Sequence, residues 1–119
     1  MSQITECPDK PNCISSLSQK ESSKISPLPF FNSLEESVEV IIAVMKEIPR
    51  SQLVTHNGNY LHFTCKTKFC IFTDDIEFQI DEINKVIHVK SASRLGYSDF
   101  GANKKRVEKI RSLLNELNR

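Results

Sequence analysis

The sequence predicts an α+β fold, in which an antiparallel sheet of about four strands carries two helices on one face, in the order helix, four strands, helix. Two periodicities support this prediction. Apolar residues recur at spacings of three and four over residues 34–48 and 107–117, and at alternate positions over much of residues 53–90. The length of 119 residues suits a single domain, residues 1–119, without a cleft between two lobes.

Residues 1–32 are expected to form an irregular strap that lies on the core. They hold four of the five prolines and a serine-rich stretch over residues 15–26, which disfavours a regular helix or strand. Apolar side chains should keep this segment on the domain: Ile14, Leu17, Leu28, Phe30 and Phe31.

A first helix is predicted over residues 34–48. Ser33 and Glu36 form a capping-box pair at its start, and Pro49 ends it. The apolar stripe that should face the sheet consists of Leu34, Val38, Ile41, Met45 and Ile48.

Four strands should follow as two antiparallel pairs. Asn57 and Gly58 are predicted as a two-residue hairpin turn, which would pair His56 with Asn59 and Val54 with Leu61. Val54, Leu61, Phe63 and Cys65 would then share one face. In the second pair, the alternating apolar residues Ile76, Phe78, Ile80, Ile87 and Val89 indicate two half-buried strands. Residues 66–75 fit either a short strand or a buried crossing.

The last helix should begin near Ser98 or Asp99, either of which can cap it, and run to the end of the chain. Its apolar stripe consists of Val107, Ile110, Leu114 and Leu117. Extended back by four positions, the stripe reaches Asn103, so a polar side chain is predicted on the core-facing side of the first turn.

Composition excludes some functions. Lys and Arg number 16 against 15 Asp and Glu, a formal net charge of +1, which argues against nucleic acid as a partner. The longest apolar run, residues 40–45, is too short for a transmembrane segment. The first residues lack the pattern of a secretory signal, so a cytoplasmic location is expected, with a trimmed export signal left open.

The junction between the last strand and the last helix, residues 91–103, is the first candidate site. It holds two of the three glycines and precedes a helix N-terminus, where free backbone N–H groups favour anions. Arg94, Tyr97 and Arg106 could complete an anion pocket there. In the alternative interpretation the glycines permit a turn, Asp99 caps the helix, Arg94 pairs with an acidic residue and Tyr97 packs.

Charge is unevenly distributed along the chain. Residues 69–85 hold five acidic residues and one lysine, whereas residues 94–119 hold seven basic and three acidic residues. Asp74, Asp75 or Glu77 should therefore attract Arg94 or Arg106. Two other interpretations stay open: Asp74 and Glu77 as paired carboxylates for acid–base chemistry, and a turn with a solvated face.

Cys7 and Cys13 enclose five residues, a spacing typical of neither a zinc knuckle nor a redox Cys-x-x-Cys pair. A disulfide between them is sterically possible, but the missing export signal favours reduced thiols. A Cys13 nucleophile or a mixed zinc site with a histidine also stays open, although we predict no metal and no cofactor.

Cys65 and Cys70 should be buried in the core. His56, His62 and His88 have no partner that the sequence identifies.

Three blocks together resemble the bacterial and plastid domain of unknown function family 1499 (DUF1499). They are residues 7–16, residues 74–78, and residues 91–101 with Asn103 and Arg106. The resemblance covers almost the whole chain and implies that the blocks belong to one shared feature. It implies no activity, because the family has none assigned.

We therefore expect the three blocks to converge at one end of the sheet and form a polar pocket for a small polar or anionic ligand or a partner peptide. Two alternatives stay open: a thiol-dependent or hydrolytic enzyme, and a structural clasp that holds the strap down. The candidate residues are Cys7, Asn12, Cys13, Asp74, Asp75, Glu77, Arg94, Tyr97, Asp99, Asn103 and Arg106.

Overall fold

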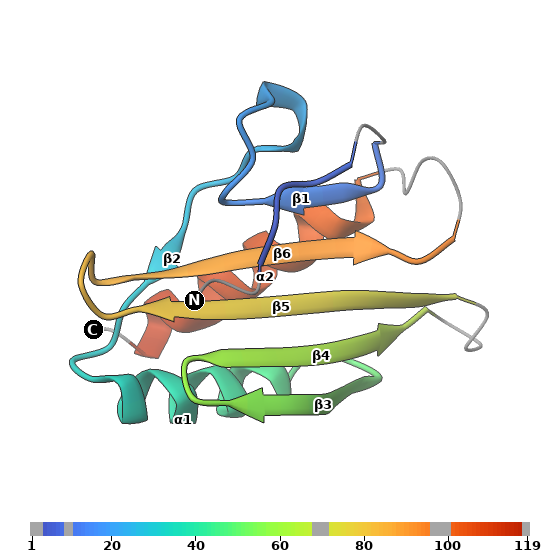
Figure 1. Ribbon diagram of the computed structural model, residues 1–119. Coiled ribbons are helices and arrows are strands. Elements are labelled where there is room, and N and C mark those ends of the chain that lie inside the picture. The colour runs from blue at the N-terminus through green and yellow to red at the C-terminus, as the bar shows by residue number, and fades with distance from the viewer. Residues whose placement is uncertain (1–3, 9–10, 68–71, 96–100, 118–119) are drawn as a thin grey trace.

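The computed structural model describes residues 4–8, 11–67, 72–95 and 101–117, and has two layers. The strands are β1 (Cys13–Ser15), β2 (Leu28–Pro29), β3 (Ser51–Asn57), β4 (Tyr60–Lys66), β5 (Thr73–Asp81) and β6 (Val86–Ser93). The helices are α1 (Leu34–Met45), α2 (Ala102–Leu117) and the short 3-10 helix η1 (Glu21–Ser23). Both long helices lie behind the sheet in Figure 1, so the predicted α+β class is confirmed.

The described residues form a sheet of six strands rather than four. Its order is β1-β6-β5-β4-β3, with β2 also paired to β6, and all named strand pairs are antiparallel. The two additional strands come from residues 1–32, so the expectation that this segment has no regular strand was wrong. They are too short to show a periodicity, and β2 tolerates Pro29 because it lies at the edge of the sheet.

The β3–β4 hairpin has a different register from the predicted one. Asn57 pairs with Tyr60 and His56 with Leu61, so the loop is Gly58–Asn59 and not Asn57–Gly58. Gly58 takes the positive φ of 63° that this loop requires, which leaves Asn57 in the strand. A bulge between Leu53 and Thr55 then turns Val54 out, and 54% of it is exposed.

The helices begin and end close to their predicted positions. The Ser33 hydroxyl accepts a hydrogen bond from the Glu36 amide at 3.1 Å, as the capping pair predicted, and α1 ends at Met45, with turns continuing to Pro49. The described part of α2 begins at Ala102; Ser98 and Asp99 lie outside the described residues. Leu117 is 56% exposed, so the buried stripe of α2 ends one turn earlier than predicted.

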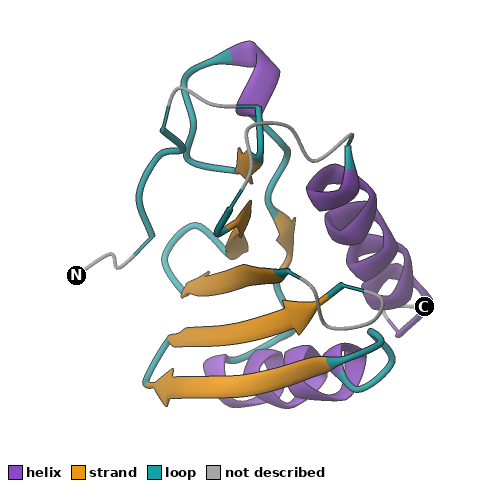
Figure 2. Ribbon diagram, turned by 90° about the vertical axis from the view of Figure 1, so that its right-hand side faces the viewer, coloured by secondary structure: helices purple, strands orange, loops and turns teal. Residues whose placement is uncertain are grey.

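The core lies between the helices and one face of the sheet, here called the core face. Side chains from β4, β5 and β6 on this face are almost fully buried against α1 and α2: Leu61, Phe63, Ile76, Phe78, Ile80, Ile87 and Val89. Neither α1 nor α2 lies on the opposite face, here called the open face, and residues 4–8 lie on that side of the sheet (Figure 2). Residue alternation therefore decides which polar side chains enter the core.

Candidate functional site

Asp74 and Asp75 are neighbours in β5, but their side chains lie on opposite faces of the sheet. Asp74 pairs with Cys65 and Ser93, in the alternation of the buried Ile76. Asp75 pairs with Thr64 and Ala92 on the open face. The predicted blocks therefore build two polar clusters, one on each face, instead of one pocket.

The cluster on the core face is centred on Arg106, and we call it the Arg106 cluster (Asp74, Ser91, Asn103 and Arg106). Arg106 Nη2 donates to Asp74 Oδ2 at 2.7 Å, and Nη1 donates to Asn103 Oδ1 at 2.8 Å and to Ser91 Oγ at 3.2 Å. The Ser91 hydroxyl donates to Asn103 Oδ1 at 2.7 Å. Asn103 Nδ2 donates to the carbonyl of Asn12 at 3.1 Å. This cluster therefore links β5, β6, α2 and the residue that precedes β1.

The Arg106 cluster is buried and internally satisfied. The side chains of Arg106 and Asp74 are 14% and 4% exposed, and Asn103 is fully buried. Across the described residues, every buried side-chain nitrogen or oxygen has a hydrogen-bond partner. Buried charge requires such pairing, because desolvation of an unpaired ion costs several kcal/mol. The burial of Asn103 is thus confirmed, but it and Arg106 face each other and not a solvent-filled pocket.

The cluster on the open face is centred on Arg94, and we call it the Arg94 cluster (Tyr60, His62, Asp75, Glu77 and Arg94). Arg94 Nε and Nη2 each donate to one carboxylate oxygen of Asp75, both at 2.9 Å. His62 Nε2 lies 2.8 Å from Asp75 Oδ1 and, because a carboxylate only accepts, carries the hydrogen of this bond. The Tyr60 hydroxyl donates to Glu77 Oε2 at 2.6 Å.

Burial and hydrogen bonding shift the pKa values of the Arg94 cluster. Burial alone would raise the pKa of Asp75, but hydrogen bonds from Arg94 and then His62 outweigh it and lower that pKa below 3.8. The same ion pair raises the pKa of Arg94. Burial, followed by the hydrogen bond to Glu77, raises the pKa of Tyr60. At neutral pH the cluster thus holds an ionised carboxylate, a cation and a protonated phenol.

Cys7 and Cys13 form a disulfide, so the expectation of reduced thiols was wrong. Their spacing matches no redox or zinc motif, yet it closes a loop that brings their Cα atoms to 5.6 Å, within ordinary disulfide reach. In this state neither sulfur is a nucleophile. The bridge instead holds residues 4–8 on the open face, where the Ile4 amide donates to Gln79 Oε1 at 3.3 Å. Cys65 is free and buried, as predicted, and Cys70 lies outside the described residues.

The family model described as a protein of unknown function (DUF1499) matches residues 3–114. The chain belongs to this family. No curated protein and no solved structure matches it significantly. Within the described ranges, no helix is long and apolar enough to cross a membrane.

The predicted residues of this DUF1499 member can now be placed. Cys13, Asp75 and Arg94 share the open face: Cys13 and Asp75 pair with Ala92 from opposite sides of β6, and only Asp75 contacts Arg94. Glu77 lies on the same face and bonds Tyr60, whereas Asn12 hydrogen-bonds the Ser93 carbonyl beside the Arg106 cluster. Tyr97 and Asp99 lie outside the described residues.

Tyr60 and His62 were missed as site residues. Neither has a motif of its own, and each joins the Arg94 cluster only through the pairing of β4 with β5. That register depends on residues 66–75, whose structure the sequence left undecided. Alternation within β4 was the one usable signal, because it put both side chains on the polar face.

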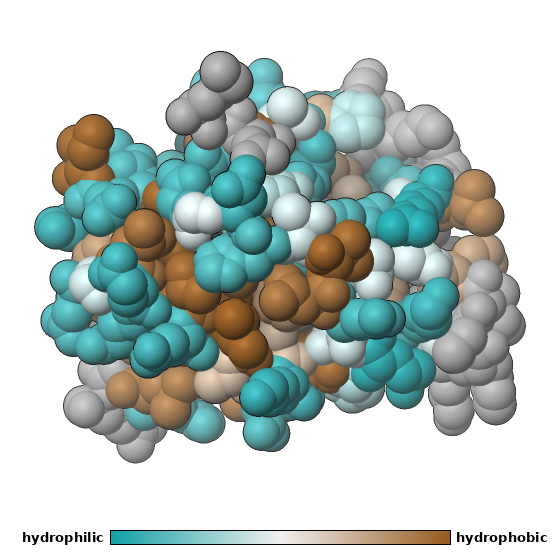
Figure 3. Space-filling model, turned by 60° about the horizontal axis from the view of Figure 1, so that its bottom comes forward, coloured by the Kyte–Doolittle hydropathy of each residue, from teal (hydrophilic) through white to brown (hydrophobic). Residues whose placement is uncertain are grey.

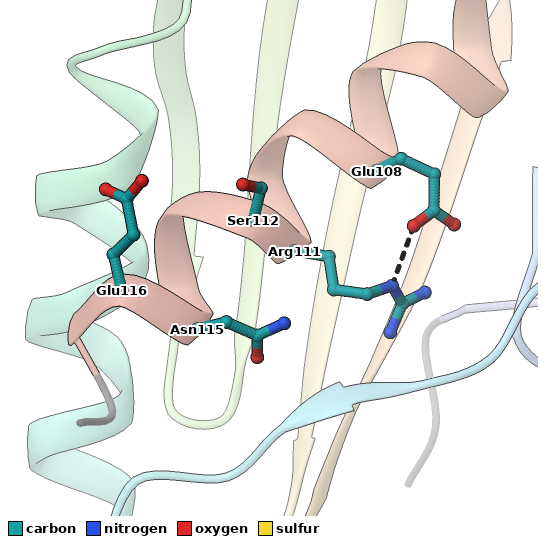
Figure 4. Close-up of a pocket in the computed structure, with 5 residues that line it drawn as sticks. All are labelled: Glu108, Arg111, Ser112, Asn115 and Glu116. Atoms are coloured by element: carbon teal, nitrogen blue, oxygen red, sulfur yellow. Dashed lines mark hydrogen bonds and ion pairs between the residues drawn. The ribbon is translucent and has the colours of Figure 1, made fainter.

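A pocket of about 340 Å³ lies on α2 and is lined by Glu108, Arg111, Ser112, Asn115 and Glu116 (Figure 4). Arg111, the one cation among the described residues that line it, is already engaged, by Glu108 at 3.1 Å and by the carbonyls of Ser26 and Pro27. Arg111 therefore ties the N-terminal segment to α2, which explains its position without a ligand. No group of three metal-ligating side chains occurs within the described part of the chain.

Proposed function

We propose that this domain binds a small carboxylate- or phosphate-bearing ligand on the open face, at Arg94. One observation supports the proposal most directly: Asp75 holds the guanidinium through Nε and Nη2, while 52% of the Arg94 side chain is exposed. Among the described residues Nη1 has no hydrogen-bond partner, so its two N–H groups are available. A guanidinium fixed on one edge is preorganised to offer the other edge to an oxyanion.

His62 would add a second polar contact. Its bond to Asp75 uses Nε2 and leaves Nδ1 as an acceptor in the neutral ring. A ligand with an anionic group and a hydroxyl could therefore use Arg94 for the first and His62 for the second. This favours a small hydroxylated or phosphorylated metabolite over a simple hydrophobic one.

The Arg106 cluster supports a second role, that of a structural clasp. Its members bond one another, and they join α2 to the strands β5 and β6 and to Asn12, which precedes β1. Because Asp74 precedes Asp75, a clasp on the core face also fixes β5 under the Arg94 cluster. The clasp alternative and the binding alternative thus apply to different faces of the same strand.

The enzyme alternatives have less support. The disulfide occupies both sulfurs of the thiol alternative, and a disulfide persists more readily in an oxidising compartment than in the cytoplasm predicted from the sequence. The carboxylates of Asp74 and Glu77, the candidate acid–base pair, lie on opposite faces of β5, so they do not favour acid–base chemistry on one substrate.

Titration of the ¹⁵N-labelled protein with inorganic phosphate, and separately with acetate, tests the binding proposal by NMR. We expect saturable shifts of the amides near Asp75 and Arg94, and at least fivefold weaker binding in Arg94→Gln, because the anion loses its charged donor. Arg50→Gln is the matched control: it removes an exposed arginine that bonds the Lys66 carbonyl at the same end of the sheet. Equal affinity in Arg94→Gln and Arg50→Gln, or no saturable shift with either anion, would refute the proposal.

A further inference from the structure

Strand β3 is a free edge of the sheet, because β4 is its only partner in the described structure. Its seven residues, Ser51–Asn57, are all at least partly exposed, and none of them is Asp, Glu, Lys or Arg. Edge strands are usually protected by charged side chains, proline or a β-bulge, since their unpaired N–H and C=O groups can template another strand. Of these devices β3 has only the bulge at Val54. On β3 the exposed side chains include Leu53 and Val54, which are 40% and 54% exposed.

Helix α1 carries a stripe beside this edge whose charges reverse about its centre. Glu39, Ile42 and Lys46 follow at spacings of three and four, so they lie along one side of the helix. Glu39 and Lys46 are exposed and Ile42 is partly exposed. Glu35 extends the acidic end and Arg50 the basic end, where Glu47 is the one opposing charge. The stripe therefore runs from acidic through apolar to basic.

A groove of about 410 Å³ connects this stripe to the edge strand. Ile42, Lys46, Arg50, Leu53 and Phe63 contribute to its lining. The Ser51 hydroxyl donates to the Met45 carbonyl, which fixes the start of β3 beside the end of α1. Figure 3 brings this side of the molecule forward and shows apolar side chains in its middle, with hydrophilic side chains around them.

We propose that the occupant of this surface is a second copy of the chain, bound about a two-fold axis through antiparallel pairing of the two β3 strands. The axis would pass near Val54, the middle residue of the strand, and would set the two α1 helices antiparallel beside each other. Glu39 of each copy then faces Lys46 of the other, and the two Ile42 side chains meet between these pairs. A surface whose charge reverses about its own midpoint is complementary to itself under two-fold rotation, whereas a partner of different sequence has no need of that pattern.

Analytical ultracentrifugation of the full chain over a range of protein concentrations tests the dimer. We expect a species of twice 13.6 kDa at low ionic strength, and weaker association in 1 M NaCl, where the Debye length is about 3 Å. Lys46→Glu should weaken association on the order of tenfold, because it reverses both symmetric ion pairs. The double variant Glu39→Lys with Lys46→Glu restores opposite charges across the axis and should recover most of the affinity.

Two further variants separate the strand from the helix. Val54→Lys should abolish association by placing a charge at the centre of the paired edge, whereas Lys109→Glu, an exposed reversal on α2, should leave it unchanged. Far-ultraviolet circular dichroism checks that each variant is folded. A monomer at every concentration in low salt would overturn the proposal, as would a dimer indifferent to Val54→Lys. A double variant no stronger than Lys46→Glu alone would overturn the charge pairing.

Discussion

The two aspartates at the start of β5 form the same kind of ion pair in opposite surroundings. Asp74 pairs with Arg106 where the two side chains are 4% and 14% exposed, and Asp75 pairs with Arg94 where they are 26% and 52% exposed. In the interior, an unpaired charge would strongly destabilise the fold, so the main effect of the pair is to avoid that destabilisation. On the surface, solvent already stabilises each charge, so the pair mainly sets geometry. The Asp74–Arg106 pair therefore serves the stability of the interior, whereas the Asp75–Arg94 pair stays accessible to solvent.

The largest expected effect is on the core face. Arg106→Met leaves Asp74 as an unpaired buried carboxylate. It also removes the guanidinium N–H group that donates to Asn103 and Ser91. We expect the free energy of unfolding to fall by about 3–5 kcal/mol, measured by urea denaturation at neutral pH. Adding Asp74→Leu to this variant should recover part of the loss, because the uncompensated charge is then gone. A loss below about 1 kcal/mol in Arg106→Met would mean that the buried pair behaves like a surface pair.

A smaller effect should follow from opening the Cys7–Cys13 bridge, which holds residues 4–8 on the open face. Cys7→Ser should cost about 2 kcal/mol, the amount expected for a short closed loop. Hydrogen exchange at the Ile4 amide should accelerate, since its bond to Gln79 depends on that segment staying in place. Reductant should destabilise the unmodified chain similarly but leave the Cys7→Ser, Cys13→Ser double variant unchanged. An unaltered Ile4 exchange rate in Cys7→Ser would show that the bridge is not what holds the segment.

Much of the core face could be predicted from the sequence, because a period of two needs no knowledge of distant residues. Alternation along the strands correctly placed Ile76, Phe78 and Ile80 in the core, and the helical period placed Asn103 there as well. The predicted β3–β4 register was wrong because an Asn-Gly pair fits a two-residue loop in more than one position. With the observed loop, the bulge at Val54 is what returns Leu53 to the core face opposite Phe63.

The open face was harder to predict because it is built from pairings between strands. The same alternation that buries Ile76 puts Asp74 and Asp75 on opposite faces, whereas the resemblance of the three blocks favoured one pocket for both. His62 joins Asp75 only through the β4–β5 register, which no local pattern reveals. The state of Cys7 and Cys13 was also beyond the sequence, because their spacing permits a disulfide without requiring one.

The smallest expected effect on stability comes from Arg94→Gln, and its size should depend on pH through the ionisation of Asp75. In the folded chain, hydrogen bonds from Arg94 and His62 hold the pKa of Asp75 below 3.8, against the opposing effect of burial. Asp75 therefore adds stability above pH 3.8, and this contribution is lost as the pH falls through the lowered folded pKa.

Arg94→Gln should raise the pKa of Asp75, as measured by ¹³C NMR of its carboxyl carbon, while the free energy of unfolding at neutral pH changes far less than in Arg106→Met. The stability difference from the unmodified chain should vanish in acid, where Asp75 is protonated in both proteins. An unchanged pKa of Asp75 would show that Arg94 does not control this carboxylate, and would remove the preorganisation on which anion binding at the open face depends.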